Sequence, residues 1–395
     1  MFRLPFAFAV VLVMAGCAGL HGAPRALSPQ TLWQDHKFAP VTLPAIDART
    51  LFALAPELQA QIDSSGIRHD SVQRRVDYLM TLLFGRGLNE FSYRSGQTTI
   101  AAETWRLKHG NCLSLSVLAY SIGRALDLKM QLQEVAVTPV FDRRGNVDFV
   151  GRHVNVLVLD PAGLKRKDGT RASGHVVIDF DPQMGSRHMG TPLTDAAVLA
   201  RYYGNLGAEY FERSDLALAY AAFKAAILAD PSFAPSYSNL AQLYRRKGLS
   251  VTSEALLLHA LALDGDDDTP LRVLQSLMLS QGRQREAQHY AEMLRARRER
   301  NPYHWLAQGV ELLGNNRNAQ AVRALERAQA LTSGFDEVHQ YLAVAYWRVG
   351  NKVDAQRQLA TLRALDAARN ADQPGAADPV IALLSRKFAA AAESR

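Results

Sequence analysis

The chain has 395 residues, of which 48% are hydrophobic and 21% are charged, and its net charge is +7. This composition is that of a globular protein long enough for two or three domains, and it excludes a disordered or fibrous chain. The positive charge is spread along the chain, and its densest cluster, at 295–300, lies in a predicted helix. We expect this cluster to be a solvated helix face and expect no nucleic-acid partner; the alternative is contact with anionic head groups or nucleic acid.

The first 16 residues have the pattern of a secretory signal peptide. Arg3 supplies a positive charge, residues 4–15 are apolar, and small residues lead to Cys17. This ending resembles a bacterial lipoprotein signal, which implies cleavage before Cys17 and acylation of that cysteine. Ala18 follows instead of Asp, so the resemblance further implies an anchor in the outer membrane, with the protein facing the periplasm. The alternative is an ordinary cleaved signal with an incidental cysteine.

Residues 17–46 predict a tether, because they are rich in Pro, Ala and Gln and have no sustained periodicity. Apolar residues at helical intervals then predict two helices. Asp47 can cap the first, which extends through Ile62, and Asp70 can cap the second, which Gly85 closes.

Cys112 is predicted to begin a buried helix. Gly110 and Asn111 break the preceding polar helix, and the residues after Cys112 are apolar on nearly every face. The free N–H groups and the positive dipole of a helix N-terminus favour a thiolate over a thiol. Once Cys17 is acylated, Cys112 is the only thiol left, in an oxidising compartment. The alternative is that Cys112 is simply a small buried hydrophobic residue.

Three strands are predicted at 131–137, 147–160 and 175–182, so helices followed by an antiparallel meander make an α+β domain at 47–198. His153 lies in the second strand and Asp179 in the third. If these strands pair, a carboxylate can reach the imidazole, but Asp179 and Asp181 share a face and the strand register decides between them.

The segments around these residues resemble the transglutaminase-like superfamily. They are GNCLSLS from Gly110, RALDL from Arg124, HVNV from His153 and VIDF from Val177. The resemblance covers roughly 72–182 and implies a papain-like core in which Cys112 is the nucleophile, His153 the base and Asp179 the residue that orients it, with Asp181 as the alternative. The family's Gly before the last apolar pair of the helix segment is Asp127 here. No phosphate loop, paired cysteine ligands or HExxH motif occurs, so we expect no cofactor and no metal.

From about Arg201 the chain is wholly helical and repeats every 34 residues. Small residues recur at one position of the repeat: Ala219, Ser253, Ala287, Ala321 and Ala355. Large apolar residues recur thirteen positions earlier, with Gln308 as the exception: Leu206, Leu240, Leu274 and Leu342. This pattern resembles tetratricopeptide (TPR) repeats, which implies an all-α superhelix of about five repeats at 199–370. Residues 371–395 are expected to be a capping helix and tail.

The sequence therefore predicts an envelope lipoprotein with a Cys-His-Asp site that acts on amide bonds of peptides or proteins through a thioester. It would be a cysteine peptidase or amidase, or a transamidating acyltransferase, with hydrolysis slightly favoured. The TPR groove would bind a protein or peptide, and lipidated Cys17 would attach the chain to the membrane. The alternative is a non-catalytic envelope scaffold that works through the repeats.

Overall fold

The computed structural model describes residues 32–85, 91–144, 147–159, 175–180, 190–332, 336–369 and 384–385. The expected signal at 1–16, Cys17, Asp181 and most of the expected capping helix and tail lie outside these residues. Within the described part of the chain, no helix is both long enough and apolar enough to cross a membrane.

The first module begins with short helices that cover one side of its core. The region expected as one helix after Asp47 is two helices, because Pro56 opens the second and a proline is tolerated at a helix start but not in its interior. Ser71, and not Asp70, caps the next helix by accepting a hydrogen bond from Arg74 N. These elements are η1 Asp35–Lys37, α2 Ala48–Phe52, α3 Pro56–Ser64, η2 Ile67–His69 and α4 Val72–Phe84.

The helix predicted to begin at Cys112 is confirmed as α6, Cys112–Ala125. The side chain of Asn111 caps it by accepting from Ser114 N at 2.9 Å. Nearly all of its residues are buried, and it contacts α2, α4, the sheet and the preceding elements. Those preceding elements are β1 Ser92–Tyr93, α5 Ala101–Leu107 and β2 His109–Gly110.

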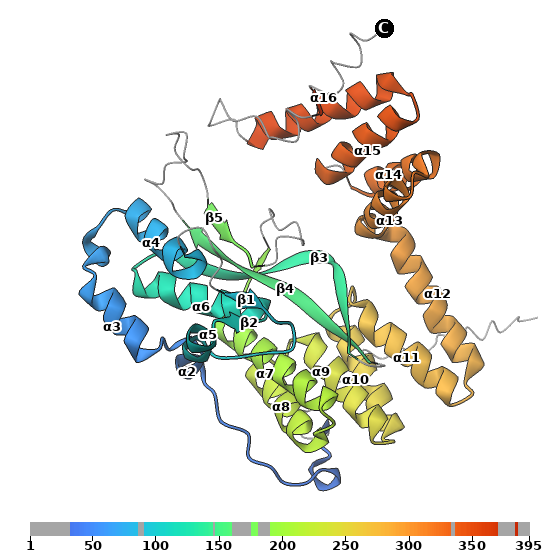
Figure 1. Cartoon of the computed structure of the whole chain (residues 1–395). Helices are drawn as coiled ribbons and strands as arrows, with labels where there is room; N and C mark the ends of the chain where they lie inside the picture. Colours follow the sequence, from blue (N-terminus) through green and yellow to red (C-terminus); the bar gives the residue numbers. More distant parts are fainter. Residues whose placement is uncertain are drawn as a thin grey trace, which may run out of the picture.

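A four-stranded sheet packs against α6 with the strand order β5-β4-β3-β6. Its strands are β3 Met130–Arg144, β4 Val147–Leu159, β5 His175–Ile178 and β6 Thr191–Pro192. All neighbours in this sheet are antiparallel, as predicted, but β3 extends to Arg144, into the region expected to be a turn at 142–146. Figure 1 shows the long β3–β4 hairpin reaching over the helices that follow.

The rest of the described chain is a series of antiparallel helix pairs. The first and second helices of successive pairs begin at 34-residue intervals from Ala234 and Leu216 onward, which confirms the predicted repeat. The pairs are α7 Asp195–Glu212 with α8 Leu216–Ala229, α9 Ala234–Arg246 with α10 Ser250–Leu263, α11 Asp268–Ser280 with α12 Gln284–Arg300, α13 Pro302–Gly314 with α14 Asn318–Leu331, and α15 Asp336–Arg348 with α16 Lys352–Arg369.

The predicted small-residue phase is buried between the helices of each pair. All five of its members, from Ala219 to Ala355, are at most 2% exposed. A Cβ atom on Gly207 would lie 2.5 Å from the ring of Phe223, and one on Gly309 would lie 2.5 Å from Leu325, the same contact three repeats later. The 34-residue period therefore reflects a repeated close approach of two helices.

Helix α7 belongs to both modules, so the expected boundary at 198/199 falls inside a helix. Val198, Tyr202 and Tyr203 of α7 lie in the hydrophobic core that contains α6. Arg201 forms an ion pair with Glu134 of β3, and each side chain is 11% exposed. The α+β module and the repeats thus share one continuous packed interface.

Residues 32–38, expected to belong to a tether, pack on the first two helix pairs instead. The ring of Phe38 stacks on Tyr220 at 4.2 Å, and Tyr220 Oη donates to Asp35 Oδ1 at 2.7 Å. Lys224 pairs with the same carboxylate, and Tyr244 Oη donates to the carbonyl of Leu32. The tether prediction is wrong for this stretch, because its few aromatic residues outweigh its linker-like composition.

Candidate functional site

His153 and Asp179 lie together at the sheet edge where β5 ends. His153 Nε2 is 2.9 Å from both carboxylate oxygens of Asp179. The β4–β5 register pairs Val156 with Ile178, which leaves Asn155 and Asp179 as the next residues of their strands. Because side chains alternate along a strand, His153, Asn155 and Asp179 share a face. The register thus places Asp179 beside the imidazole, whereas Asp181 lies outside the described residues.

A buried amide series holds the carboxylate of Asp179 in place. Asn155 Nδ2 donates to Asp179 Oδ2 at 3.1 Å, and Asn155 Oδ1 accepts from Gln133 Nε2 at 2.8 Å. Gln133 Oε1 in turn accepts from Gly190 N at 2.7 Å. Asn155 and Gln133 are at most 1% exposed. Each amide donates to one partner and accepts from another, so the series fixes their orientation as well as that of Asp179.

Cys112 is the first residue of α6, and its thiol lies close enough to His153 to raise the pKa of the imidazole. Burial by itself lowers the pKa of His153, but hydrogen bonds with Asp179 and Cys112, together with the charges of these groups, raise that pKa from 6.5 to about 10. The His153 side chain is 4% exposed and that of Asp179 is 11% exposed. Cys112 is half-buried, so it is the member of the group that is open to solvent.

The start of α6 is tied to both the sheet and the repeats. Ser116 Oγ donates to the carbonyl of Val154, next to His153 on β4, at 3.0 Å. On the other side, Asn111 Nδ2 donates to Thr98 Oγ1 at 2.8 Å, and Thr98 N donates to Glu209 Oε1 of α7 at 2.7 Å. Glu209, Thr98 and Asn111 are all less than 9% exposed. The position of Cys112 therefore depends on a buried hydrogen-bond series that begins in the repeat array.

A half-buried thiol, a buried imidazole and a largely buried carboxylate thus lie in series, and the imidazole is hydrogen-bonded to the carboxylate. Such a series can move a proton from the thiol to the imidazole and hold the resulting imidazolium against the carboxylate. The helix N-terminus adds a positive partial charge beside the sulfur. Such an arrangement is chemically able to support nucleophilic attack by a cysteine.

The sequence reasoning did not single out Asn155, Gln133 or Glu209. Strand alternation puts Asn155 on the face of His153, so its proximity could have been inferred, but the reach from Gln133 depends on the β3–β4 register. The contact of Glu209 joins residues 111 positions apart and has no sequence signal.

Comparison with known proteins adds little to this geometry. No protein-family model matches the chain, and no curated protein matches it. Among solved structures, PilF of Pseudomonas aeruginosa is similar at a TM-score of 0.26 and 19% identity, over 51% of this chain and 87% of PilF. MamA is similar at a TM-score of 0.24 and 19% identity, over 46% of this chain and 98% of MamA. YrrB, described as a TPR protein with an unusual peptide-binding site, is similar at a TM-score of 0.24 and 18% identity, over 48% of this chain and 92% of YrrB. The TPR organisation of this chain therefore stands on its own helix periodicity.

Proposed function

We propose that the α+β module is a transglutaminase-like cysteine enzyme that acts on amide bonds of peptides or proteins. The observation that carries the proposal is that His153 is hydrogen-bonded to Asp179 and lies beside a thiol at the N-terminus of α6, which raises the pKa of the imidazole. In this proposal Cys112 is the nucleophile, His153 the general base and acid, and Asp179 the residue that orients His153.

The proposed reaction begins when His153 takes the thiol proton and Cys112 Sγ attacks the amide carbonyl carbon. The backbone N–H of Cys112 is placed to stabilise the oxyanion at the helix N-terminus. The C–N bond then breaks, the leaving nitrogen takes the proton from His153, and a thioester remains on Cys112. His153 next deprotonates a water molecule, whose attack releases a carboxylic acid and the free thiol. An amine in place of water would give a new amide, and hydrolysis is the slightly favoured outcome.

The proposal includes a place in the cell. The N-terminal pattern ending at Cys17 supports a lipid anchor in the outer membrane with the chain facing the periplasm. The repeats would bind a protein or peptide partner, as stacked helix pairs offer a continuous surface.

The proposal is tested by the rate at which iodoacetamide alkylates Cys112 as a function of pH, in the wild type and in His153→Ala. We expect fast alkylation at pH 6–7, well below the value of about 8.5 at which a free thiol ionises, and loss of this reactivity in His153→Ala. His289→Ala, on the exposed surface of α12, is the matched control and should react like the wild type. A slow wild-type rate at pH 6–7 that His153→Ala does not change would contradict the proposal.

The second candidate is a non-catalytic scaffold, and the observation that favours it is the shared core of α7. This continuous packing would let the first module act as a rigid end to the repeat array. Cys112→Ala distinguishes the two candidates. A scaffold keeps its cellular role with this substitution, whereas an enzyme loses that role while partner binding remains intact.

A further inference from the structure

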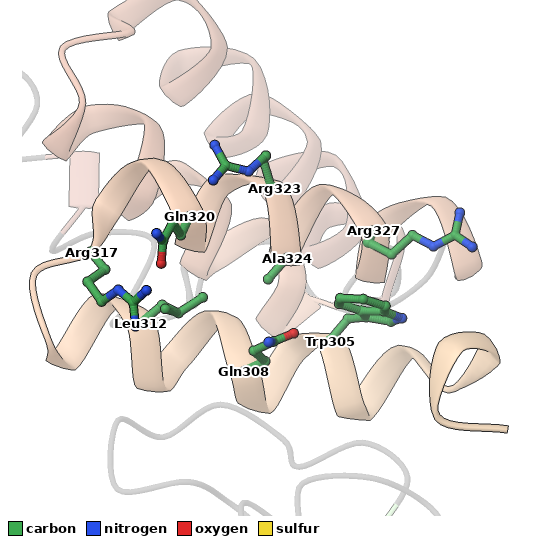
Figure 2. Close-up of a pocket in the computed structure, with 8 residues that line it drawn as sticks. All are labelled: Trp305, Gln308, Leu312, Arg317, Gln320, Arg323, Ala324 and Arg327. Carbon is green, nitrogen blue, oxygen red and sulfur yellow. The ribbon is translucent and has the colours of Figure 1, made fainter. Parts of the chain in front are cut away.

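The fourth helix pair carries a hollow lined by unpaired arginines. Figure 2 shows Trp305, Gln308 and Leu312 rising from α13 toward α14, with the side chains of three arginines around them. The hollow is open to solvent and has a volume of about 480 Å³, and its arginines, Arg317, Arg323 and Arg327, are all exposed. In the described part of the chain, no carboxylate forms an ion pair with any of these three guanidinium groups. We propose that this hollow binds an acidic peptide segment of a partner protein.

The neighbouring repeats, offset by 34 residues, carry carboxylates that the fourth pair lacks. Arg283 of the third pair lies 34 residues before Arg317 and forms ion pairs with Glu286 and Glu254. Arg357 occupies the phase of Arg323 in the fifth pair and is paired with Asp354. Both Glu286 and Asp354 have the same counterpart in the fourth pair, which is Gln320. An uncharged amide therefore stands where both neighbouring repeats carry a carboxylate.

Glu254, the second carboxylate that pairs with Arg283, also has an amide as its counterpart. This amide is Gln288, 34 residues later. Both replacements remove negative charge and leave hydrogen-bonding groups of nearly the same shape. The positive charge around Arg317 and Arg323 is thus uncompensated at positions where adjacent repeats compensate it. Such a site favours a ligand that brings its own carboxylates.

The hollow exists because the core of the array is interrupted at this place. Gln308 is exposed at the phase where Leu240 and Leu274 of earlier pairs are fully buried. One buried cluster ends at Ala287 and the next begins at Leu313. Between them, α12 and α13 bury few residues, and Gln308 of α13 is one of the side chains that line the hollow.

The lining fits an extended acidic peptide better than a membrane surface. The three guanidinium groups can each bind a carboxylate, and the amides of Gln308 and Gln320 can bond to a peptide backbone. Trp305 and Leu312 add an apolar part to the lining of the hollow. A layer of anionic head groups could pair with the exposed arginines, but it brings no apolar side chain to Trp305 and Leu312.

The test measures the binding of a fluorescein-labelled peptide of alternating Glu and Leu to the full chain in a non-ionic detergent, by fluorescence anisotropy. Gln320→Glu restores the carboxylate of the neighbouring repeats, and we expect it to weaken binding about tenfold. The triple variant Arg317→Gln, Arg323→Gln, Arg327→Gln should abolish binding. A matched triple variant of exposed arginines on α12, Arg285→Gln, Arg295→Gln, Arg300→Gln, should bind as the wild type does.

Three results would overturn the proposal. The first is equal binding by wild type and Gln320→Glu, and the second is an equal loss in the two triple variants, which would indicate net charge alone. The third is binding to phosphatidylglycerol vesicles that Gln320→Glu weakens while the peptide does not bind. Cys112→Ala should bind the peptide like the wild type, so failure of the proposed enzymatic activity and failure of this site are distinguishable.

Discussion

Glu209 joins the repeat array to the helix that carries Cys112, so its removal tests the structural basis of the site. Its carboxylate accepts the N–H of Thr98, whose hydroxyl accepts from the Asn111 cap of α6. Glu209→Ala leaves the buried N–H of Thr98 without an acceptor. A buried donor that loses its partner costs about 1–3 kcal/mol. At roughly 2–4 °C per kcal/mol for a unit of about 150–250 residues, the melting temperature should fall by about 2–12 °C.

Glu209→Gln is the matched variant because its amide oxygen can still accept from Thr98. It should retain most of the stability that Glu209→Ala loses. It also removes the charge that faces Arg213 at 3.9 Å, but an ion pair with such an exposed arginine contributes only about 0–1 kcal/mol. Arg213→Ala measures that contribution separately.

The assay combines thermal unfolding with the rate of Cys112 alkylation at pH 7. We expect Glu209→Ala to lower both, because Thr98, the hydrogen-bond partner of the Asn111 cap, loses the carboxylate that accepts its N–H. Glu209→Gln should restore both. If Glu209→Ala unfolds within about 0.5 kcal/mol of the wild type and reacts at the same rate, the series from α7 to α6 has no energetic importance and the reasoning fails.

The remaining predictions test the pairing of His153 with Asp179, the packing of the repeats and the docking of residues 32–38. The pKa of His153 is raised above its unfolded value to about 10, so the stability that this residue adds is complete below about pH 6.5 and is lost as the pH rises through 10. Denaturant unfolding should therefore show that the free-energy advantage of the wild type over Asp179→Asn shrinks across that range. A constant difference would contradict the pairing of His153 with Asp179. Gly207→Ala should destabilise by about 1–3 kcal/mol because its Cβ meets the ring of Phe223, while Gly204→Ala on the same helix, where no atom lies within 4 Å, should be neutral or stabilising by up to about 1 kcal/mol. Tyr220→Phe removes its hydrogen bonds with Gln34 and Asp35, so limited proteolysis should cleave the chain near residues 32–38 faster than in the wild type, and an unchanged rate would mean that the stacking on Phe38 holds the segment alone.

Local signals in the sequence were enough for the elements that depend on nearby residues. The break at Gly110 and Asn111 and the apolar run after Cys112 predicted α6, and the 34-residue period predicted the helix pairs. These signals succeed because a helix start and a helix crossing each require particular residue types at fixed spacing. The alternation of polar and apolar residues likewise placed His153 and Asp179 on two predicted strands that could pair.

The features that the sequence did not predict all depend on contacts between distant residues. Strand register could not be read from alternation alone, so Asp179 and Asp181 stayed open as partners of His153. The docking of residues 32–38 on Tyr220 and Tyr244 joins positions about 200 apart, and their local composition is that of a linker. Pro56 did carry a local signal, but the apolar spacing across it concealed the break between α2 and α3.

The shared helix α7 changes how the two modules should be separated in experiments. Tyr203 exchanges hydrogen bonds with the backbone of Ile46, Arg201 pairs with Glu134, and Glu209 bonds to Thr98. Ending the chain at residue 198 would remove all three side chains and expose the core residues that Tyr202 covers. Breaking a buried ion pair on one side alone costs about 3–5 kcal/mol. A stable α+β fragment therefore has to extend at least through Glu212, where α7 ends, and we expect a fragment ending at 198 to be unfolded by circular dichroism.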